Sequence, residues 1–318
     1  MHEQATQTGD GRRAMAALEW AASIAERPRP DALDGTSSIA AAPLDFQVAL
    51  ACYPSDLRKV LDRVMMSDDA EAGLDALLAC GALSALMPEV QAMVGFGDGE
   101  WRHKDVWKHT KQVVRQAVPR LEVRWAALLH DIGKIKTRSI SPDGEVHFFG
   151  HAEVGARMFD KMNRRLPIFA SEASLRDSVR FLILHHLRAS QYDASWTDSA
   201  VRRFAREMGD SLDDLLCLSR ADITTKRPEK KKKGLRQISE LADRVRVIAE
   251  QDAQVPPLPS GIGDAIMASF AIPPSRLIGE IKRKLELEIE AGELTPHLTA
   301  DDYIAILRAN PAKYGLPV

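Results

Sequence analysis

The 318-residue sequence has few cysteines and no long apolar run. Cys52, Cys80 and Cys217 are isolated and form no CxxC pair, so we expect neither a disulfide framework nor a zinc knuckle. No apolar run approaches the roughly 18 residues of a membrane-spanning helix, and the N-terminus lacks the apolar segment of a signal peptide. These absences predict a cytoplasmic protein with no membrane partner.

The sequence also lacks a strong excess of charge. Its 43 basic and 45 acidic side chains give a formal net charge of −2. Such a chain has no global attraction to nucleic acids, so any affinity for them must come from a local group of charges. The apolar fraction of 45% is typical of a folded protein, and the length is sufficient for a sizeable core.

No convincing strand pattern and no repeat of fixed period is present, whereas apolar residues recur at helical spacing from Asp45 onward. The sequence therefore predicts an all-α protein. We expect helices within residues 54–65, 70–90, 105–118, 123–133, 151–166, 171–188, 197–209, 211–223, 275–292 and 300–310.

The composition divides the chain into four parts. Residues 1–43 combine an Ala-rich segment typical of a helix with a segment that contains Pro and Gly. We expect a poorly ordered extension there. Residues 44–100 form a helical segment, and residues 101–225 hold most of the histidines. Residues 226–318 are expected to form a basic loop followed by a helical tail.

Imidazole and carboxylate groups gather in the histidine-rich part, mostly at helix ends. Each isolated polar group in a core would need its own partner or cost about 1–3 kcal/mol. One or two metal ions would satisfy the groups together, and mixed imidazole and carboxylate ligands suit divalent transition metals. The candidate ligands are His109, His130, Asp131, His151, His185, His186 and Asp222.

The order of these residues, H…HD…H…HH…D, resembles the signature of the HD superfamily of metal-dependent phosphohydrolases. Around it, "LLACGALSALMPEV", "AALLHDIGK", "FFGHAEVGARM" and "IPPSRLIGEI" resemble the C-terminal half of bacterial CCA-adding tRNA nucleotidyltransferases and poly(A) polymerases, over roughly residues 45–310. Those enzymes carry a head domain with a Gly-Gly motif and paired aspartates. No such motif occurs in this sequence, so we do not expect nucleotide addition.

The resemblance implies an HD phosphohydrolase domain over residues 101–225 and a chemistry for it. His109, His130, Asp131 and Asp222 would form a mononuclear set, and the remaining histidines would complete a second site. We favour two divalent ions (Mn, Fe, Co or Ni), bridged by Asp131 and holding a hydroxide that attacks phosphorus. Catalytic roles are assigned to Asp131, Lys134 and Arg188, with Arg220 as a further phosphate contact. Asp105 would orient His109 or lie at the surface, and His103 and His147 would flank the site.

A lysine run follows the last candidate ligand. It includes Lys230, Lys231, Lys232 and Lys233, and its simplest interpretation is a solvated loop and helix start. Because it begins a few residues after Asp222, it could also bind the phosphates of an RNA.

Three functions are compatible with this sequence. The first is hydrolysis of nucleotide or RNA-end phosphoesters, such as 2′,3′-cyclic phosphates, with a nucleotide or RNA 3′ end as the partner. The second is an RNA-binding partner subunit related to the body and tail of a nucleotidyltransferase. The third is hydrolysis of a signalling nucleotide, although the absence of a GYP triplet weakens the cyclic-dinucleotide version. The seven candidate ligands favour the first.

Overall fold

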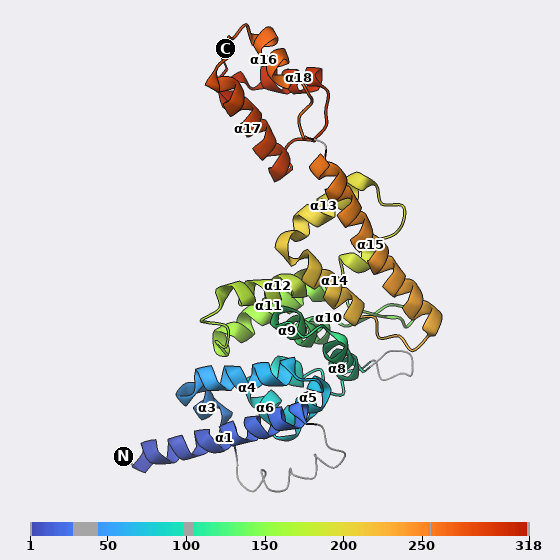
Figure 1. Cartoon of the computed structure of the whole chain (residues 1–318). Coiled ribbons are helices and arrows are strands. Elements are labelled where there is room, and N and C mark those ends of the chain that lie inside the picture. Colours follow the sequence, from blue (N-terminus) through green and yellow to red (C-terminus); the bar gives the residue numbers. More distant parts are fainter. Residues whose placement is uncertain (1, 28–43, 98–104, 255, 317–318) are drawn as a thin grey trace. The chain divides into compact units, whose positions relative to one another are not determined.

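The computed structural model describes residues 2–27, 44–97, 105–254 and 256–316. The regular secondary structure within these residues is almost entirely helical, which confirms the all-α class. The chain forms two compact units, Met1–Ser195 with Met208–Leu241, and Trp196–Glu207 with Ala242–Val318. The helices are labelled in Figure 1. None of the helices in the described ranges is long and apolar enough to cross a membrane.

The first unit contains the following helices: α1 (His2–Glu26), α3 (Phe46–Cys52), α4 (Pro54–Met66), α5 (Ala70–Ala79), α6 (Ala82–Leu86), α7 (Pro88–Gln91), α8 (Val106–Gln116), α9 (Leu121–Leu129), α10 (Lys134–Thr137), α11 (His151–Arg165), α12 (Ala173–His185), the 3₁₀ turn η2 (Ala189–Gln191) and α14 (Leu212–Ala221). A hairpin of β1 (Ser139–Ile140) and β2 (Val146–His147) precedes α11.

Helix α1 corrects the expectation of a poorly ordered extension over residues 1–43. It packs against α3, α4 and α5, as Figure 1 shows for the dark-blue ribbon, and Leu18 is fully buried. The small side chains of its Ala-rich face allow a close approach to α5, where a Cβ atom on Gly73 would lie 2.6 Å from the Cβ of Ala25. At the surface, Arg63 pairs with Glu19 of α1 at 2.6 Å. The remainder of the expected extension, residues 28–43, lies outside the described residues.

Helix α9 is the centre of the first unit. Its side chains from Val123 to Leu129 are buried around the whole helix, and it packs against α4, α8, α12 and α14. A helix that is apolar all round belongs inside a protein. Its one buried cation, Arg124, donates hydrogen bonds to the carbonyls of Ala117 and Met65 at 2.8 and 2.9 Å. The residues that follow the C-terminal end of α9 therefore lie in the interior.

The second unit includes α13 (Asp198–Met208) up to Glu207, the C-terminal part of α15 (Pro228–Gln254), α16 (Ile262–Phe270), α17 (Arg276–Ala291), α18 (Ala300–Ala309) and the 3₁₀ turn η4 (Pro311–Tyr314). The last four elements share an apolar core around Ile266, Leu285 and Tyr303. A further 3₁₀ turn, η3 (Gly209–Ser211), joins α13 to α14.

Lys230–Lys233 of the lysine run, expected to be a solvated loop and helix start, lie entirely within a helix. Residues 230–233 lie in the first turns of α15, which begins at Pro228. Proline is well tolerated in the first turn of a helix, and lysine is a good helix former. The segment that begins at Pro228 can therefore start a helix rather than precede one. The division between the two units falls within α15, after Leu241, and not where the basic run begins.

Candidate metal centre

Five helices of the first unit supply the candidate ligands. His109 lies on the inner face of α8, and His130 and Asp131 directly follow α9. His151 is the first residue of α11, His186 follows α12, and Asp222 follows α14. Apart from His109, which lies within α8, these side chains stand at helix ends, where the helices meet.

A close backbone contact joins two of these helix ends. Gly133, just after Asp131, lies against the first turn of α11, where an added Cβ atom would lie 2.7 Å from the nitrogen of Gly155 and 2.9 Å from the carbonyl carbon of His151. Only a residue without a side chain fits this contact. The contact brings Nε2 of His151 to 3.5 Å from Oδ1 of Asp131.

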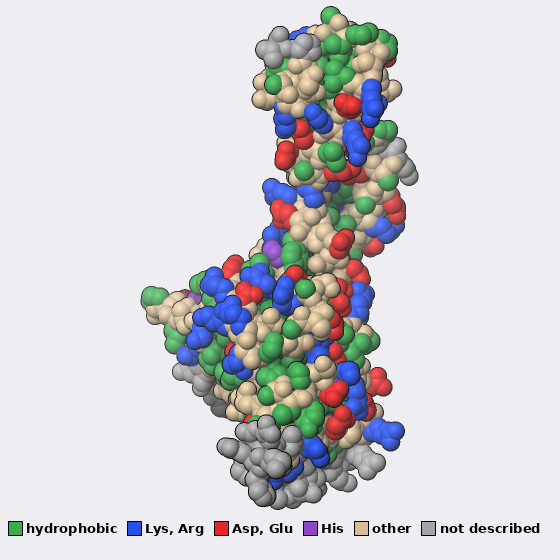
Figure 2. Space-filling view, turned by 90° about the vertical axis from the view of Figure 1, so that its left-hand side faces the viewer, with side chains coloured by type: hydrophobic (Ala, Val, Ile, Leu, Met, Phe, Trp, Pro, Cys, Tyr) green, Lys and Arg blue, Asp and Glu red, His purple; other side chains and the backbone are tan. Residues whose placement is uncertain are grey.

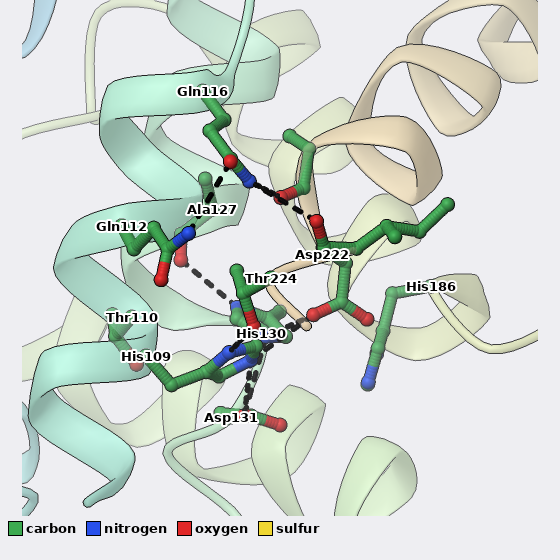
Figure 3. A network of polar contacts seen from close by, with 12 residues as sticks. His109, Thr110, Gln112, Gln116, Ala127, His130, Asp131, His186, Asp222 and Thr224 are labelled. Atoms are coloured by element: carbon green, nitrogen blue, oxygen red, sulfur yellow. Dashed lines mark hydrogen bonds and ion pairs between the residues drawn. The ribbon is translucent and has the colours of Figure 1, made fainter. Parts of the chain in front are cut away.

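The ligand atoms form two groups that share Asp131. The first group is His109, His130 and Asp131, and the second is Asp131, His151 and His186. In the first, Oδ2 of Asp131 lies 3.4 Å from Nε2 of His109 and 3.2 Å from Nε2 of His130. Asp222 adds Oδ1 at 3.0 Å from Nε2 of His109, and Figure 3 shows these four side chains converging.

Hydrogen bonds orient the imidazole rings in the same way. Nδ1 of His130, His151 and His186 lies 2.8–2.9 Å from the backbone carbonyls of residues 127, 148 and 183, respectively. A carbonyl only accepts hydrogen bonds, so each Nδ1 must carry a proton, and each Nε2 is directed at the centre, where it can present a lone pair to a metal ion. Nδ1 of His109 has its partner in the hydroxyl of Thr224, at 2.8 Å. Such contacts are typical of histidines that bind metal ions.

Two unsatisfied features show that these residues fit a bound cation. Nε2 of His130 and Oδ1 of Asp131 are buried without a hydrogen-bond partner. Nε2 of His151 and Nε2 of His186 lie 3.1 Å apart, although the backbone contacts at Nδ1 make both atoms acceptors. A divalent transition metal would satisfy these lone pairs, and the mixture of nitrogen and oxygen donors suits such ions.

The electrostatics of the cluster also favour a cation. Burial acts to raise the pKa values of Asp131 and Asp222, but interactions with His109 and His130 outweigh it and keep both pKa values below their usual range. Burial acts to lower the pKa of His130, yet the two carboxylates raise it to about 10, so that Nε2 of His130 carries a second proton, which a bound metal ion would displace. For His186, burial and the charge of His130 lower the pKa to about 4. Both carboxylates therefore remain ionised at the centre.

The surrounding residues include two that sequence reasoning missed. Thr224 contacts His109, and Gln116 donates to the carbonyl of Ala221 at 2.7 Å, which ties α8 to the end of α14 beside Asp222. Gln116 lies seven residues after His109, and this spacing places both on one face of a helix. That spacing is a usable signal. Nothing in the identity of Thr224 distinguishes it from a surface threonine.

Other predicted site residues occupy varied positions. Nζ of Lys134 donates to Oδ2 of Asp131 at 2.6 Å, so this lysine lies at the centre. His185 is in neither ligand group, and its ring packs on Phe181 with 4.3 Å between centroids. Asp105 caps α8 by accepting a hydrogen bond from the backbone nitrogen of Lys108.

The remaining candidates lie around the cluster or outside the described part of the chain. Arg188 precedes η2, Arg220 lies in the last turn of α14, and both side chains are partly exposed. His147 lies on β2, and His103 is outside the described residues.

Comparison with known proteins agrees with this geometry. The HD domain family matches residues 106–227, which include every residue of both ligand groups and Asp222. The A-adding tRNA nucleotidyltransferase of Deinococcus radiodurans is 31% identical over 246 residues, covering 75% of this chain and 55% of that protein. The CC-adding enzyme of Thermus thermophilus is 30% identical over 244 residues, covering 74% of this chain and 52% of that protein.

A shorter match is found in the multifunctional CCA protein of Pseudomonas fluorescens, which is 35% identical over 113 residues, covering 34% of this chain and 27% of that protein. The chain spans about half the length of the first two relatives. The resemblance stated from the sequence is thereby confirmed: the chain carries an HD domain and is related to the C-terminal half of the A-adding and CC-adding tRNA nucleotidyltransferases.

Proposed function

We propose that this protein is a metal-dependent phosphohydrolase that acts on nucleotide or RNA-end phosphoesters, including 2′,3′-cyclic phosphates. The observation that carries the proposal is the pair of ligand groups sharing Asp131, with the histidine Nε2 atoms directed at one centre. A binding module has no need of buried lone pairs without partners, because each costs stability. A site that holds metal ions does need them, because the ions satisfy these lone pairs.

Each residue has a role in this proposal. His109, His130, His151, His186, Asp131 and Asp222 would hold the ions, which when bound would act as Lewis acids and lower the pKa of water. Lys134 donates to Asp131 and is 22% exposed, so its ammonium can also reach a phosphate oxygen at the surface of the centre. A cation there would stabilise the negative charge that develops on phosphorus-bound oxygens.

The relatives suggest the class of substrate. The A-adding and CC-adding relatives are tRNA nucleotidyltransferases, and we infer an RNA 3′ end or a nucleotide as the substrate of this chain. Lys230–Lys233 are exposed at the start of α15, and their side chains would contact the phosphates of an RNA, with Arg188 and Arg220 as further contacts. Elsewhere acidic and basic side chains are interspersed, as on the face in Figure 2, in keeping with the net charge of −2.

Removal and return of metal tests the function directly. After chelation and dialysis, the protein should hydrolyse neither bis(p-nitrophenyl) phosphate nor adenosine 2′,3′-cyclic phosphate. Addition of Mn²⁺, Co²⁺ or Ni²⁺ should restore turnover, because the nitrogen-rich ligand set favours transition metals over Mg²⁺. Full activity in excess chelator would exclude the proposal. Absence of hydrolysis in the metal-loaded protein, together with RNA binding, would favour the partner-subunit alternative, which the nucleotidyltransferase relatives support.

The number of ions can be tested with neighbouring histidines. If each ligand group holds one ion, elemental analysis should find about two ions per chain. His186→Ala removes a member of the second group and should lower the value to about one. His185→Ala, in which the ring packed on Phe181 is lost, should leave it near two. A stoichiometry of one that neither substitution changes would establish a mononuclear site.

A further inference from the structure

An exposed aromatic side chain lies just before the candidate metal centre. Phe149 is 77% exposed, the highest value among the exposed large apolar side chains of the described residues, and the others in that set are aliphatic. Single exposed apolar residues are common on protein surfaces, so exposure alone indicates nothing. The surroundings of Phe149 distinguish it from such residues.

The ring of Phe149 is already stacked on one side. The ring of His147 lies nearly parallel to it, with an interplanar angle of 13° and 4.9 Å between centroids. His147 belongs to β2, where it pairs with Ser139 of β1. The tight turn of this hairpin is closed by the hydrogen bond from the backbone nitrogen of Gly144 to the carbonyl of Ser141, at 2.9 Å. The hairpin therefore supports one face of the Phe149 ring, and the exposed fraction leaves the opposite face to solvent.

The same segment is fixed to the metal centre. The carbonyl of Phe148 accepts the hydrogen bond that orients His151, and Nζ of Lys134 lies 5.7 Å from the centroid of the Phe148 ring. Phe149 is two residues from His151, so their Cα atoms are at most about 7.6 Å apart. Gly150 between them has φ +71°, a left-handed conformation that starts α11 immediately after Phe149. The backbone that carries the Phe149 ring is thus held within two residues of a candidate metal ligand.

We propose that Phe149, supported by His147, is a stacking platform for the nucleobase adjacent to the phosphoester that the centre cleaves. The inference rests on the proposed function for the identity of that phosphoester. Nucleobases stack on aromatic side chains because every base has a π-face, and a pre-stacked ring presents such a face with little loss of conformational freedom. The platform favours substrates that carry a base over other phosphoesters, and it accepts any of the bases, because stacking reads no hydrogen-bonding pattern.

The test compares a substrate with a base and one without. Binding is measured on the metal-loaded protein by fluorescence anisotropy, with a 5′-fluorescein-labelled hexaadenylate and the same oligonucleotide with an abasic 3′-terminal residue, both checked for integrity on a gel. Phe149→Leu, which keeps an apolar side chain but removes the ring, should weaken hexaadenylate binding about 5- to 150-fold. It should leave binding of the abasic probe nearly unchanged, and Phe149→Trp should retain the base preference.

Ile140→Thr is the matched control, because Ile140 is an exposed aliphatic residue of the same hairpin. It should change neither affinity. In the kinetic experiment, Phe149→Leu should raise KM for adenosine 2′,3′-cyclic phosphate. It should leave KM for the cyclic phosphate of 1-methoxyribose unchanged. Equal losses on both probes, or no base preference in the unmodified protein, would overturn the platform. A base preference in binding without hydrolysis of either cyclic phosphate would reject the proposed function and retain the platform.

Discussion

Asp131→Asn is expected to reduce turnover of a phosphoester at least about 1,000-fold, which corresponds to about 4 kcal/mol in the activation barrier. Asp131 belongs to both ligand groups, so its loss weakens both ion sites at once. Removal of an outer partner of a metal ligand already costs about 10- to 100-fold in metal affinity or activity, and a shared ligand should cost more. Steady-state kinetics and elemental analysis of the same preparation would measure both effects.

Asp177→Asn provides the control for this substitution. It makes the same chemical change on α12, where the carboxylate is 64% exposed and pairs with Arg176. Turnover and metal content should match those of the unmodified protein. Full activity of Asp131→Asn at normal helical content would show that the shared carboxylate has no part in the reaction.

Gly133→Ala should have the next largest effect, on stability and metal content together. The new Cβ atom would meet backbone atoms of His151 and Gly155, which cannot move away as a flexible side chain would. Overpacking of this kind typically costs 1–3 kcal/mol and sometimes more. We expect at least about 3 kcal/mol, because α11 must shift as a unit. That shift would separate His151 from Asp131, so the variant that still folds should bind about one ion.

The facing glycine supplies the comparison. A Cβ atom on Gly155 would lie 3.4 Å from a methyl carbon of Ile183 and 3.5 Å from the nitrogen of Gly133, which are ordinary van der Waals separations. Gly155→Ala should therefore be neutral or stabilise the protein by up to about 1 kcal/mol, since alanine favours the helix. Thermal unfolding of the two variants measures the difference. Similar melting temperatures would mean that the contact at Gly133 is not tight in solution.

The helices could be predicted well because their apolar residues recur at helical spacing along α4, α8, α11 and α17. Two features of the fold could not. The docking of α1 depends on a close approach at Gly73, which no periodicity records. The hairpin has two residues in each strand, too few for an alternating pattern to be detected. The start of α15 was predicted only in part, because a run of like charges is compatible with a solvated loop as well as with a helix start.

The candidate ligands could be named because imidazole and carboxylate side chains follow apolar helices in a distinctive order. Their spatial roles could not be separated. His185 and His186 are neighbours in the sequence, yet consecutive residues of a helix project about 100° apart, and only His186 joins a ligand group. Thr224 remained unpredicted because its contact with His109 spans 115 positions along the chain.

The backbone contacts at Nδ1 have a consequence for how this protein can change over generations. Main-chain carbonyls fix the orientation of three of the four imidazole rings, those of His130, His151 and His186. No amino-acid replacement at positions 127, 148 or 183 can delete these carbonyls. The orientation of the fourth ring, that of His109, depends on the side-chain hydroxyl of Thr224. Point mutation can therefore adjust the donor strength of His109 gradually, through Thr224, while the other three rings keep their orientation as long as the fold persists. Diversification of metal preference among descendants of this chain is expected to begin at residue 224.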